Sequence, residues 1–277
     1  MRLALLAAAG LAFATPALAD THGEAMMGES HAHHHALKEA IASDVRGEDG
    51  MRDQWRHPFE TLDLFGVTPG MTVVDYMPAG GWYTRILVPY LGAEGRYIGL
   101  TPDPAAADAE RFGGYFAGLP AKFEEASPGW NLSGAPMSIY ASQDVPDEMA
   151  GTVDRALIFR EMHNLLRSGV MYTELTRIRS MLKDDGMLGI VQHRAKADAP
   201  ADYTNGNNGY LRQEDVIALV EAHGFELVGM SDINANPADP ANWEGGVWTL
   251  PPGNNGDVAE AAATGESDRM TLLFKKR

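Results

Sequence analysis

Two histidines stand where the chain leaves short apolar segments that have the composition of buried strands. His163 follows the segment 153–159, and His193 follows the segment 187–191. Parallel strands of one sheet end at the same edge, so both imidazoles could converge there and serve acid–base chemistry, since an imidazole titrates near neutrality. The alternative is that each ring is a structural hydrogen-bonding group or an exposed loop residue. The neighbouring side chains that could orient the rings or clamp an anionic substrate are Arg160, Glu161, Asn164 and Arg194.

A second chemical feature is a glycine-rich turn after the β-branched segment 72–77, which carries the acidic residue Asp75. The turn contains Gly80 and Gly81, and glycine lets a backbone approach a ligand closely. Tyr83, just beyond it, could stack on a ligand or pack beneath the helices that precede the segment. The turn therefore indicates a ligand-binding loop, with a plain tight turn between strand and helix as the alternative.

The elements that must position these residues alternate between strand and helix. Short β-branched or apolar runs predict strands at residues 72–77, 96–100, 138–140, 153–159, 187–191, 226–230 and 270–274. Helical spacing predicts helices within residues 37–65, 82–91, 172–182 and 213–223. This alternation predicts a doubly wound, mostly parallel α/β sheet of seven strands. We expect a single domain over residues 37–277, in which residues 231–269 form a long loop insertion.

The first residues have the pattern of a secretory signal peptide: a basic start, an apolar run and small residues before Asp20. We expect cleavage after Ala19 and a periplasmic or secreted protein. Residues 20–36 are rich in His and Met and predict a disordered leader. Imidazole and thioether groups bind copper, nickel or zinc, so weak transition-metal binding by this leader is one interpretation, and a solvated tail is the other.

Composition excludes several function classes. The chain has 22 Lys+Arg against 38 Asp+Glu, a formal net charge of -16, which argues against nucleic-acid binding by bulk charge. It has 0 Cys, which excludes disulfide scaffolds, cysteine-ligated metals and thiol catalysis. After the signal peptide, no segment is apolar enough to predict a membrane span.

The segment from Val73 to Thr84 resembles motif I of the class I S-adenosylmethionine-dependent methyltransferases, where a strand ends in an acidic residue and a glycine-rich loop. The resemblance covers residues 50–277. Segments similar to later elements of the family, in the same order, are residues 153–159, 182–191 and 211–225. Segments similar to a subgroup of exported predicted methyltransferases are residues 56–62, 80–84 and 162–164.

This resemblance implies a Rossmann-like methyltransferase fold with N-terminal helices and a C-terminal antiparallel strand, S-adenosylmethionine as cofactor, and methyl transfer to a small-molecule acceptor. The cofactor-binding residues that it implies are Asp75, Ala79, Gly80, Gly81, Thr101, Asp103 and Asp144. We expect His163 and His193 to be the catalytic pair beside the acceptor. The expected substrate-binding residues are Tyr83, Arg160, Asn164 and Arg194.

The sequence departs from the family at two places. The three glycine positions of the motif align with Met77, Ala79 and Gly81, so one of them is glycine. The acid that ends the second strand and binds ribose aligns with Thr101, and Asp103 follows two residues later. These departures leave a second hypothesis open, an exported protein of the same fold that binds a small ligand or acts as a lyase or hydrolase in the same crevice. A third is a metal-handling protein centred on the leader.

Overall fold

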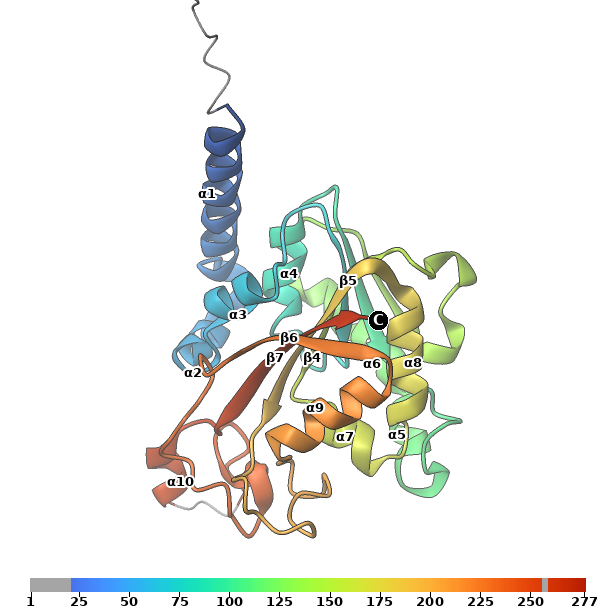
Figure 1. Cartoon of the computed structure of the whole chain (residues 1–277), viewed down its shortest axis with the longest axis vertical. Helices are drawn as coiled ribbons and strands as arrows, with labels where there is room; N and C mark the ends of the chain where they lie inside the picture. Colours follow the sequence, from blue (N-terminus) through green and yellow to red (C-terminus); the bar gives the residue numbers. More distant parts are fainter. Residues whose placement is uncertain (1–20, 256–258) are drawn as a thin grey trace, which may run out of the picture.

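Seven strands form one sheet in the computed structural model of the chain, which describes residues 21–255 and 259–277. Their order across the sheet is β3-β2-β1-β4-β5-β7-β6 (Figure 1). The strands are β1 (Thr72–Tyr76), β2 (Arg96–Thr101), β3 (Met137–Ala141), β4 (Val153–Phe159), β5 (Leu182–His193), β6 (Phe225–Ser231) and β7 (Arg269–Lys276). The pairings are parallel except those of β7, which runs antiparallel to β5 and β6. The predicted doubly wound sheet with a C-terminal antiparallel strand is therefore confirmed.

The central strand β1 is buried on both of its faces. Val73, Val74 and Tyr76 are each at most 1% exposed, and Val74 aligns with Ile98 of β2 and Ala156 of β4. Successive side chains of a strand point to opposite faces, so a strand with buried side chains on both faces has a cover on each face. This explains why the sheet has helices on both sides.

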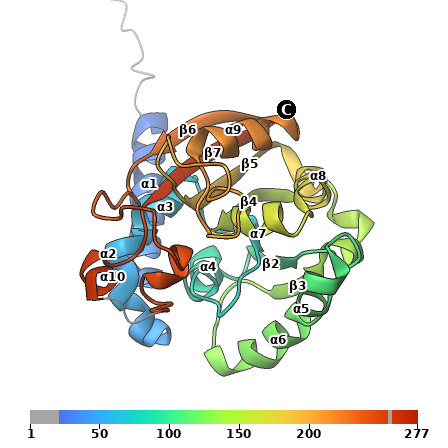
Figure 2. The same ribbon diagram turned by 90° about the horizontal axis from the view of Figure 1, so that it is seen from below.

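Two groups of helices supply that cover (Figure 2). The α-helices are α1 (Thr21–Ile41), α2 (Asp53–Arg56), α3 (Pro58–Leu64), α4 (Thr84–Leu91), α5 (Gly114–Ala117), α6 (Leu119–Ala126), α7 (Met162–Arg167), α8 (Met171–Met181), α9 (Gln213–Ala222) and α10 (Ala259–Thr264). The shorter helical turns are η1 (Asp44–Arg52), η2 (Ala109–Gly113), η3 (Ser127–Trp130), η4 (Ser142–Asp144), η5 (Asp147–Met149) and η6 (Gly246–Thr249). One face packs against α1, α3 and α4, and the other against α7, α8 and α9.

The first described residues are helical, which corrects the prediction of a disordered leader over residues 20–36. Residues 21–36 belong to α1, whose sequence has no proline and several strong helix formers. The end of α1 docks on the domain, since Leu37 is buried and Nε2 of His34 lies 2.8 Å from Oδ1 of Asp63. The start of α1 stands clear of the sheet (Figure 1). The predicted signal peptide, residues 1–19, lies outside the described residues.

The long loop between β6 and β7 contains η6 and α10 and folds back against the N-terminal helices. Gly265 approaches Trp55 so closely that a Cβ there would lie 2.3 Å from the indole ring. Arg269 donates from Nη1 to the carbonyl oxygen of Trp55 at 3.0 Å. Figure 2 accordingly shows α10 beside α2. The N-terminal helices and the loop before β7 thus come together next to the carboxyl edge of the sheet.

Two negative findings apply to the part of the chain that the structure describes. No group of three or more His, Cys, Asp or Glu side chains there could hold a metal ion. The metal affinity expected of the His- and Met-rich segment therefore has no support from those residues. No helix in the same residues is long and apolar enough to cross a membrane.

Candidate active site

The loop after β1 keeps a glycine-type backbone although two of its three glycine positions hold other residues. Met77, Ala79 and Gly81 have φ of 52°, 49° and 77°. A non-glycine residue in this left-handed region costs roughly 1–2 kcal/mol because its Cβ crowds the following carbonyl oxygen. The departures from the motif in sequence therefore leave its backbone shape intact.

Beneath the loop, Asp75 is buried and hydrogen-bonded within the protein. Its Oδ2 accepts from the hydroxyl of Tyr97 at 2.8 Å, and that hydroxyl also pairs with Oγ1 of Thr84 at 2.8 Å. Burial raises the pKa of Asp75 to about 7, although the Tyr97 hydrogen bond and the charge of Arg160 oppose the shift. Asp75 is therefore held by a side chain of β2, and it lies outside the two cavities described next.

A first cavity, of about 240 Å³, opens beside this loop at the ends of β1 and β2, and we call it the loop cavity. It is lined by Met77, Pro78, Ala79, Thr101, Tyr115, Leu119, Lys122, Phe123, Ile139 and Glu161. It lies where the order of the strands reverses between β1 and β4, which is the usual place for a small molecule in an open α/β sheet. The chain thus forms a largely apolar cavity at the expected crevice.

The residues assigned to the cofactor from sequence divide between this cavity and its surroundings. Ala79 and Thr101 line it, and Gly80 is exposed on the loop beside it. Asp103 lies in a separate groove, where its backbone N–H donates to the carboxylate of Glu174 at 3.0 Å. Asp144 is exposed outside the loop cavity and accepts from the amide of Gln143 at 3.1 Å.

Gly81 approaches a side chain of this protein and not the loop cavity. A Cβ at this position would lie 2.5 Å from Cη2 of Trp130, the residue that ends η3. The expectation that glycine at 81 clears space for a ligand is therefore not met, because the indole of Trp130 fills that space.

A second cavity, of about 390 Å³, adjoins the first and shares Ala79, Tyr115 and Glu161 with it. We call it the arginine cavity. Its polar lining comes from the ends of β4 and β5, from α7 and from the start of β7, and comprises Arg160, Glu161, His163, Asn164, Arg167, His193, Glu266, Ser267 and Arg269. Its apolar lining comes from the loop before β7 and comprises Val247, Trp248, Leu250, Pro251 and Pro252.

The two histidines converge in the arginine cavity, with ring centroids 5.8 Å apart. Nδ1 of His193 shares a hydrogen bond with Oγ of Ser267 at 2.6 Å, and Nδ1 of His163 lies 3.5 Å from Oε1 of Gln192. Burial, assisted by the charge of Arg167, lowers the pKa of His163 to about 3. Burial and the charge of Arg269 lower the pKa of His193 well below its usual value. Both imidazoles are therefore neutral at pH 7 and are weak bases.

Glu161 occupies the junction of the two cavities. It precedes α7 directly after Arg160, whose φ of 64° turns the chain out of β4. Oε2 of Glu161 accepts from Nδ2 of Asn164 at 2.5 Å. Burial raises the pKa of Glu161 to about 7, and the hydrogen bond from Asn164 opposes the shift. This carboxyl group can accordingly give or take a proton near neutral pH.

Two of the substrate-binding residues expected from sequence lie elsewhere. Tyr83 is buried under the N-terminal helices, where its ring stacks on Phe159 with centroids 3.5 Å apart. Arg194 points away from the arginine cavity and is held by Asp268 at 3.0 Å and by Asp232 at 2.6 Å. Arg160 and Asn164, by contrast, line the arginine cavity.

Sequence analysis did not assign Tyr115, Trp248, Glu266, Ser267 or Arg269 to the site. They come from segments without a recognisable motif, and the last four lie in or just after the loop over residues 231–269. The length of that loop was the only available signal, since long loops in compact domains are often functional.

Comparison with known proteins shows the fold. No known protein-family profile matches the chain, and no curated protein sequence matches it. Among solved structures, a chain in the complex between the Haloferax volcanii Trm112 methyltransferase activator and a methyltransferase is 14% identical, with a TM-score of 0.51 over 87% of this chain and 97% of that chain.

Two other solved structures are less similar in shape. A geranyl diphosphate methyltransferase in complex with SAM is 14% identical, with a TM-score of 0.49 over 87% of this chain and 90% of that one. A SAM-dependent methyltransferase from Aquifex aeolicus is 15% identical, with a TM-score of 0.47 over 82% and 93%. The Haloferax match and the strand order together show that the chain has the class I methyltransferase fold.

Proposed function

We propose that this protein is an S-adenosylmethionine-dependent methyltransferase acting on a small molecule, with the cofactor in the loop cavity and the acceptor in the arginine cavity. The observation that carries the proposal is the loop after β1. It holds Met77 and Ala79 at positive φ, at a cost of roughly 1–2 kcal/mol each. Backbone strain of this kind concentrates at binding sites, and here it lies at the edge of a cavity at the strand switch point.

The residues around the loop cavity fit this cofactor. Leu119, Phe123 and Ile139 form an apolar wall suited to the adenine ring. The hydroxyl of Thr101, at the end of β2, can hydrogen-bond a ribose hydroxyl in place of the acid found in the family. Glu161 faces the junction, where a carboxylate favours a positively charged sulfur.

When bound, the cofactor would supply an electrophilic methyl group on a cationic sulfur, to which a lone pair of the acceptor would bond while the sulfur leaves as a neutral thioether. The chain's own task is to hold the acceptor and remove its proton. We assign proton removal to Glu161, because it lines both cavities and a pKa of about 7 leaves it roughly half ionised at neutral pH. Asn164 orients that carboxyl group through its hydrogen bond.

His163 and His193, the catalytic pair expected from sequence, take a different part in this proposal. Their lowered pKa values make them poor proton acceptors but leave neutral rings that can hydrogen-bond the acceptor. His193 is fixed by Ser267, so its Nε2 is the ring nitrogen that remains for a ligand. Both histidines thus serve to bind and orient the acceptor.

We also propose that the protein is exported to the periplasm or secreted, with cleavage after Ala19. This proposal rests on the signal-peptide pattern of residues 1–19 alone.

Calorimetric titration with S-adenosylhomocysteine tests the proposed function through two substitutions at one position. Ala79→Phe places a ring at the edge of both cavities from an exposed residue, so it should abolish binding while leaving the fold intact. Ala79→Gly is the matched control: glycine suits φ of 49°, so binding should persist. Equal affinity of the two variants would place the cofactor elsewhere, and no binding to the unchanged protein would reject the proposal.

A further inference from the structure

The arginine cavity concentrates positive charge in a protein of net charge -16. Three guanidinium groups line it, from Arg160, Arg167 and Arg269, against the carboxyl groups of Glu161 and Glu266. Glu161 has a pKa of about 7, so it supplies only about half a negative charge at neutral pH. The cavity is therefore cationic although the molecule as a whole is strongly anionic.

Two of these guanidinium groups form no ion pair and no hydrogen bond within the described residues, although Glu161 and Glu266 lie in the same cavity. Neither Arg160 nor Arg167 forms an ion pair there, and no hydrogen bond from either side chain to those residues is found. Arg167 instead lies over the rings of Phe112 and Trp248, at 5.6 and 5.3 Å from their centroids. Arg160 and Arg167 are only partly buried and line the cavity, so their guanidinium groups can reach a ligand inside it.

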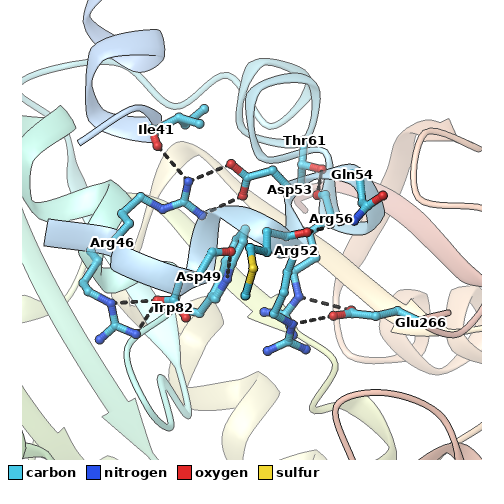
Figure 3. Close-up of polar contacts among 12 residues, drawn as sticks. Ile41, Arg46, Asp49, Arg52, Asp53, Gln54, Arg56, Thr61, Trp82 and Glu266 are labelled. Atoms are coloured by element: carbon cyan, nitrogen blue, oxygen red, sulfur yellow. Dashed lines mark hydrogen bonds and ion pairs between the residues drawn. The ribbon is translucent and has the colours of Figure 1, made fainter. Parts of the chain in front are cut away.

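The third arginine of the lining, Arg269, shares a single carboxylate with two further arginines, Arg52 and Arg56. Figure 3 shows Arg52 and Arg56 on Glu266, with Nε to oxygen distances of 2.5 and 3.2 Å. Arg269 also donates to Glu266. Both Nη atoms of Arg56 and Nε of Arg269 are buried without a hydrogen-bond partner in the described residues. Unpaired buried charge is costly, so Arg269, the member of this group that lines the cavity, favours a further anion.

The neighbouring groups agree with a positive potential. Both histidines have lowered pKa values, and nearby arginines contribute to each shift after burial. Burial and the charge of Arg269 lower the pKa of Arg160 to about 10, which leaves it cationic at neutral pH. An anion in the cavity would relieve this mutual repulsion.

Other residues that line the arginine cavity are apolar. Val247, Trp248 and Leu250 line it from the loop before β7. We infer that the acceptor carries an oxyanion, a carboxylate or a phosphate, on a small apolar body, and that Arg160 and Arg167 bind the oxyanion. Guanidinium groups pair with both kinds of oxyanion through two parallel hydrogen bonds. The identification of this ligand as the methyl acceptor rests on the proposed function, whereas the oxyanion site itself does not depend on it.

The same chemistry exists in the carboxylate of the cofactor itself, so the source of the anion must be tested. The geometry favours the acceptor, because Arg160 and Arg167 line the arginine cavity and are absent from the loop cavity. A cationic sulfur would also be repelled by an arginine cluster.

The experiment is calorimetric titration of the protein with benzoate and with phenyl phosphate, each repeated with saturating S-adenosylhomocysteine, and with neutral benzamide as the reference. We expect benzoate or phenyl phosphate to bind with or without S-adenosylhomocysteine, and benzamide to bind at least tenfold more weakly. Arg160→Gln and Arg167→Gln should each weaken anion binding about tenfold or more, since each removes a charged hydrogen-bond donor to the oxyanion.

Arg177→Gln is the matched control, because Arg177 is a partly buried arginine that lines a separate groove. It should leave anion binding unchanged, and circular dichroism checks that all three variants are folded. Equal binding of benzamide and benzoate, or equal loss in Arg177→Gln, overturns the inference.

The two proposals fail in different ways. Displacement of benzoate by S-adenosylhomocysteine shows that the arginines hold the cofactor's carboxylate and overturns the assignment to the acceptor. Binding of S-adenosylhomocysteine without any anion binding overturns the inference and leaves the proposed function standing. Anion binding without S-adenosylhomocysteine binding overturns the proposed function. The anion would then be a ligand of the protein but not a methyl acceptor.

Discussion

Replacing Glu266 with Gln should destabilise the protein more than any other single change of a carboxylate to its amide. Glu266 is 2% exposed and faces Arg52 and Arg56 from the N-terminal helices (Figure 3). It also pairs with Arg269 at the start of β7. Removing its charge leaves these guanidinium groups without a counter-ion in a buried place.

The magnitude follows from the pKa of this carboxyl group. Burial alone would raise the pKa of Glu266, but the surrounding guanidinium groups, foremost Arg269, outweigh burial and lower it from 4.5 to about 2. Lowering the pKa from 4.5 to about 2 corresponds to about 3 kcal/mol of stability. Because the folded-state pKa is the lower one, this stability is present above about pH 4.5 and is lost as the pH falls through about 2.

Urea unfolding followed by tryptophan fluorescence measures the effect. Glu266→Gln should lower the free energy of unfolding by about 3 kcal/mol at pH 7 and by about 2 kcal/mol near pH 3.5. The control is Glu226→Gln, which removes a carboxylate that pairs with Lys275 at 3.3 Å on the surface. The control should cost less than about 1 kcal/mol, because exposed ion pairs are screened by water.

Two results would refute this reasoning. A loss in Glu266→Gln no larger than in Glu226→Gln would show that the buried arginines do not depend on the carboxylate. A loss that stays constant between pH 7 and about pH 3.5 would show that it does not arise from the ionised form.

Three further predictions concern the loop, the proton acceptor and export. Gly81→Ala should lower the free energy of unfolding by about 2–4 kcal/mol, because the added Cβ meets Trp130 and the φ of this residue is 77°. Gly80→Ala should leave the free energy of unfolding nearly unchanged, since nothing lies near its Cβ. Equal losses in thermal or urea unfolding would contradict the packing of Gly81 on Trp130. Once an acceptor is identified, kcat/KM should rise with pH through about 7, and Glu161→Gln should lose that pH dependence. A pH profile that is unchanged in Glu161→Gln would exclude Glu161 as the base. The intact mass of exported protein should correspond to a chain that begins at Asp20, and retention of residues 1–19 would refute the signal peptide.

The sheet could be predicted from sequence because its strands are short apolar runs bounded by clear turns. The run 153–159, for example, is the observed β4, and its neighbours in the sheet follow from the alternation of strand and helix. The structure of the segment before the sheet was harder to predict from sequence. Residues 21–36 have a polar composition that suggests disorder, but their helix-forming residues continue into α1, whose end packs on the domain through Leu37.

The site was predictable only where strand ends define it. His163 and His193 meet because β4 and β5 are neighbours, which the strand assignments already implied. Glu266 and Arg269 reach the same cavity through a loop whose path depends on tertiary contacts, for which no local pattern exists. At position 81 a close approach does require glycine, as the sequence indicates. The group that approaches is the indole of Trp130 and not a ligand.

The central claim is that the cofactor occupies the cavity beside the loop after β1. A crystal structure of the protein grown with saturating S-adenosylhomocysteine tests it most directly. We predict ligand density in the loop cavity, in contact with Ala79 and Thr101, and with the thioether on the side of Glu161. Density at another place, or an unoccupied loop cavity at saturating ligand, would contradict the account.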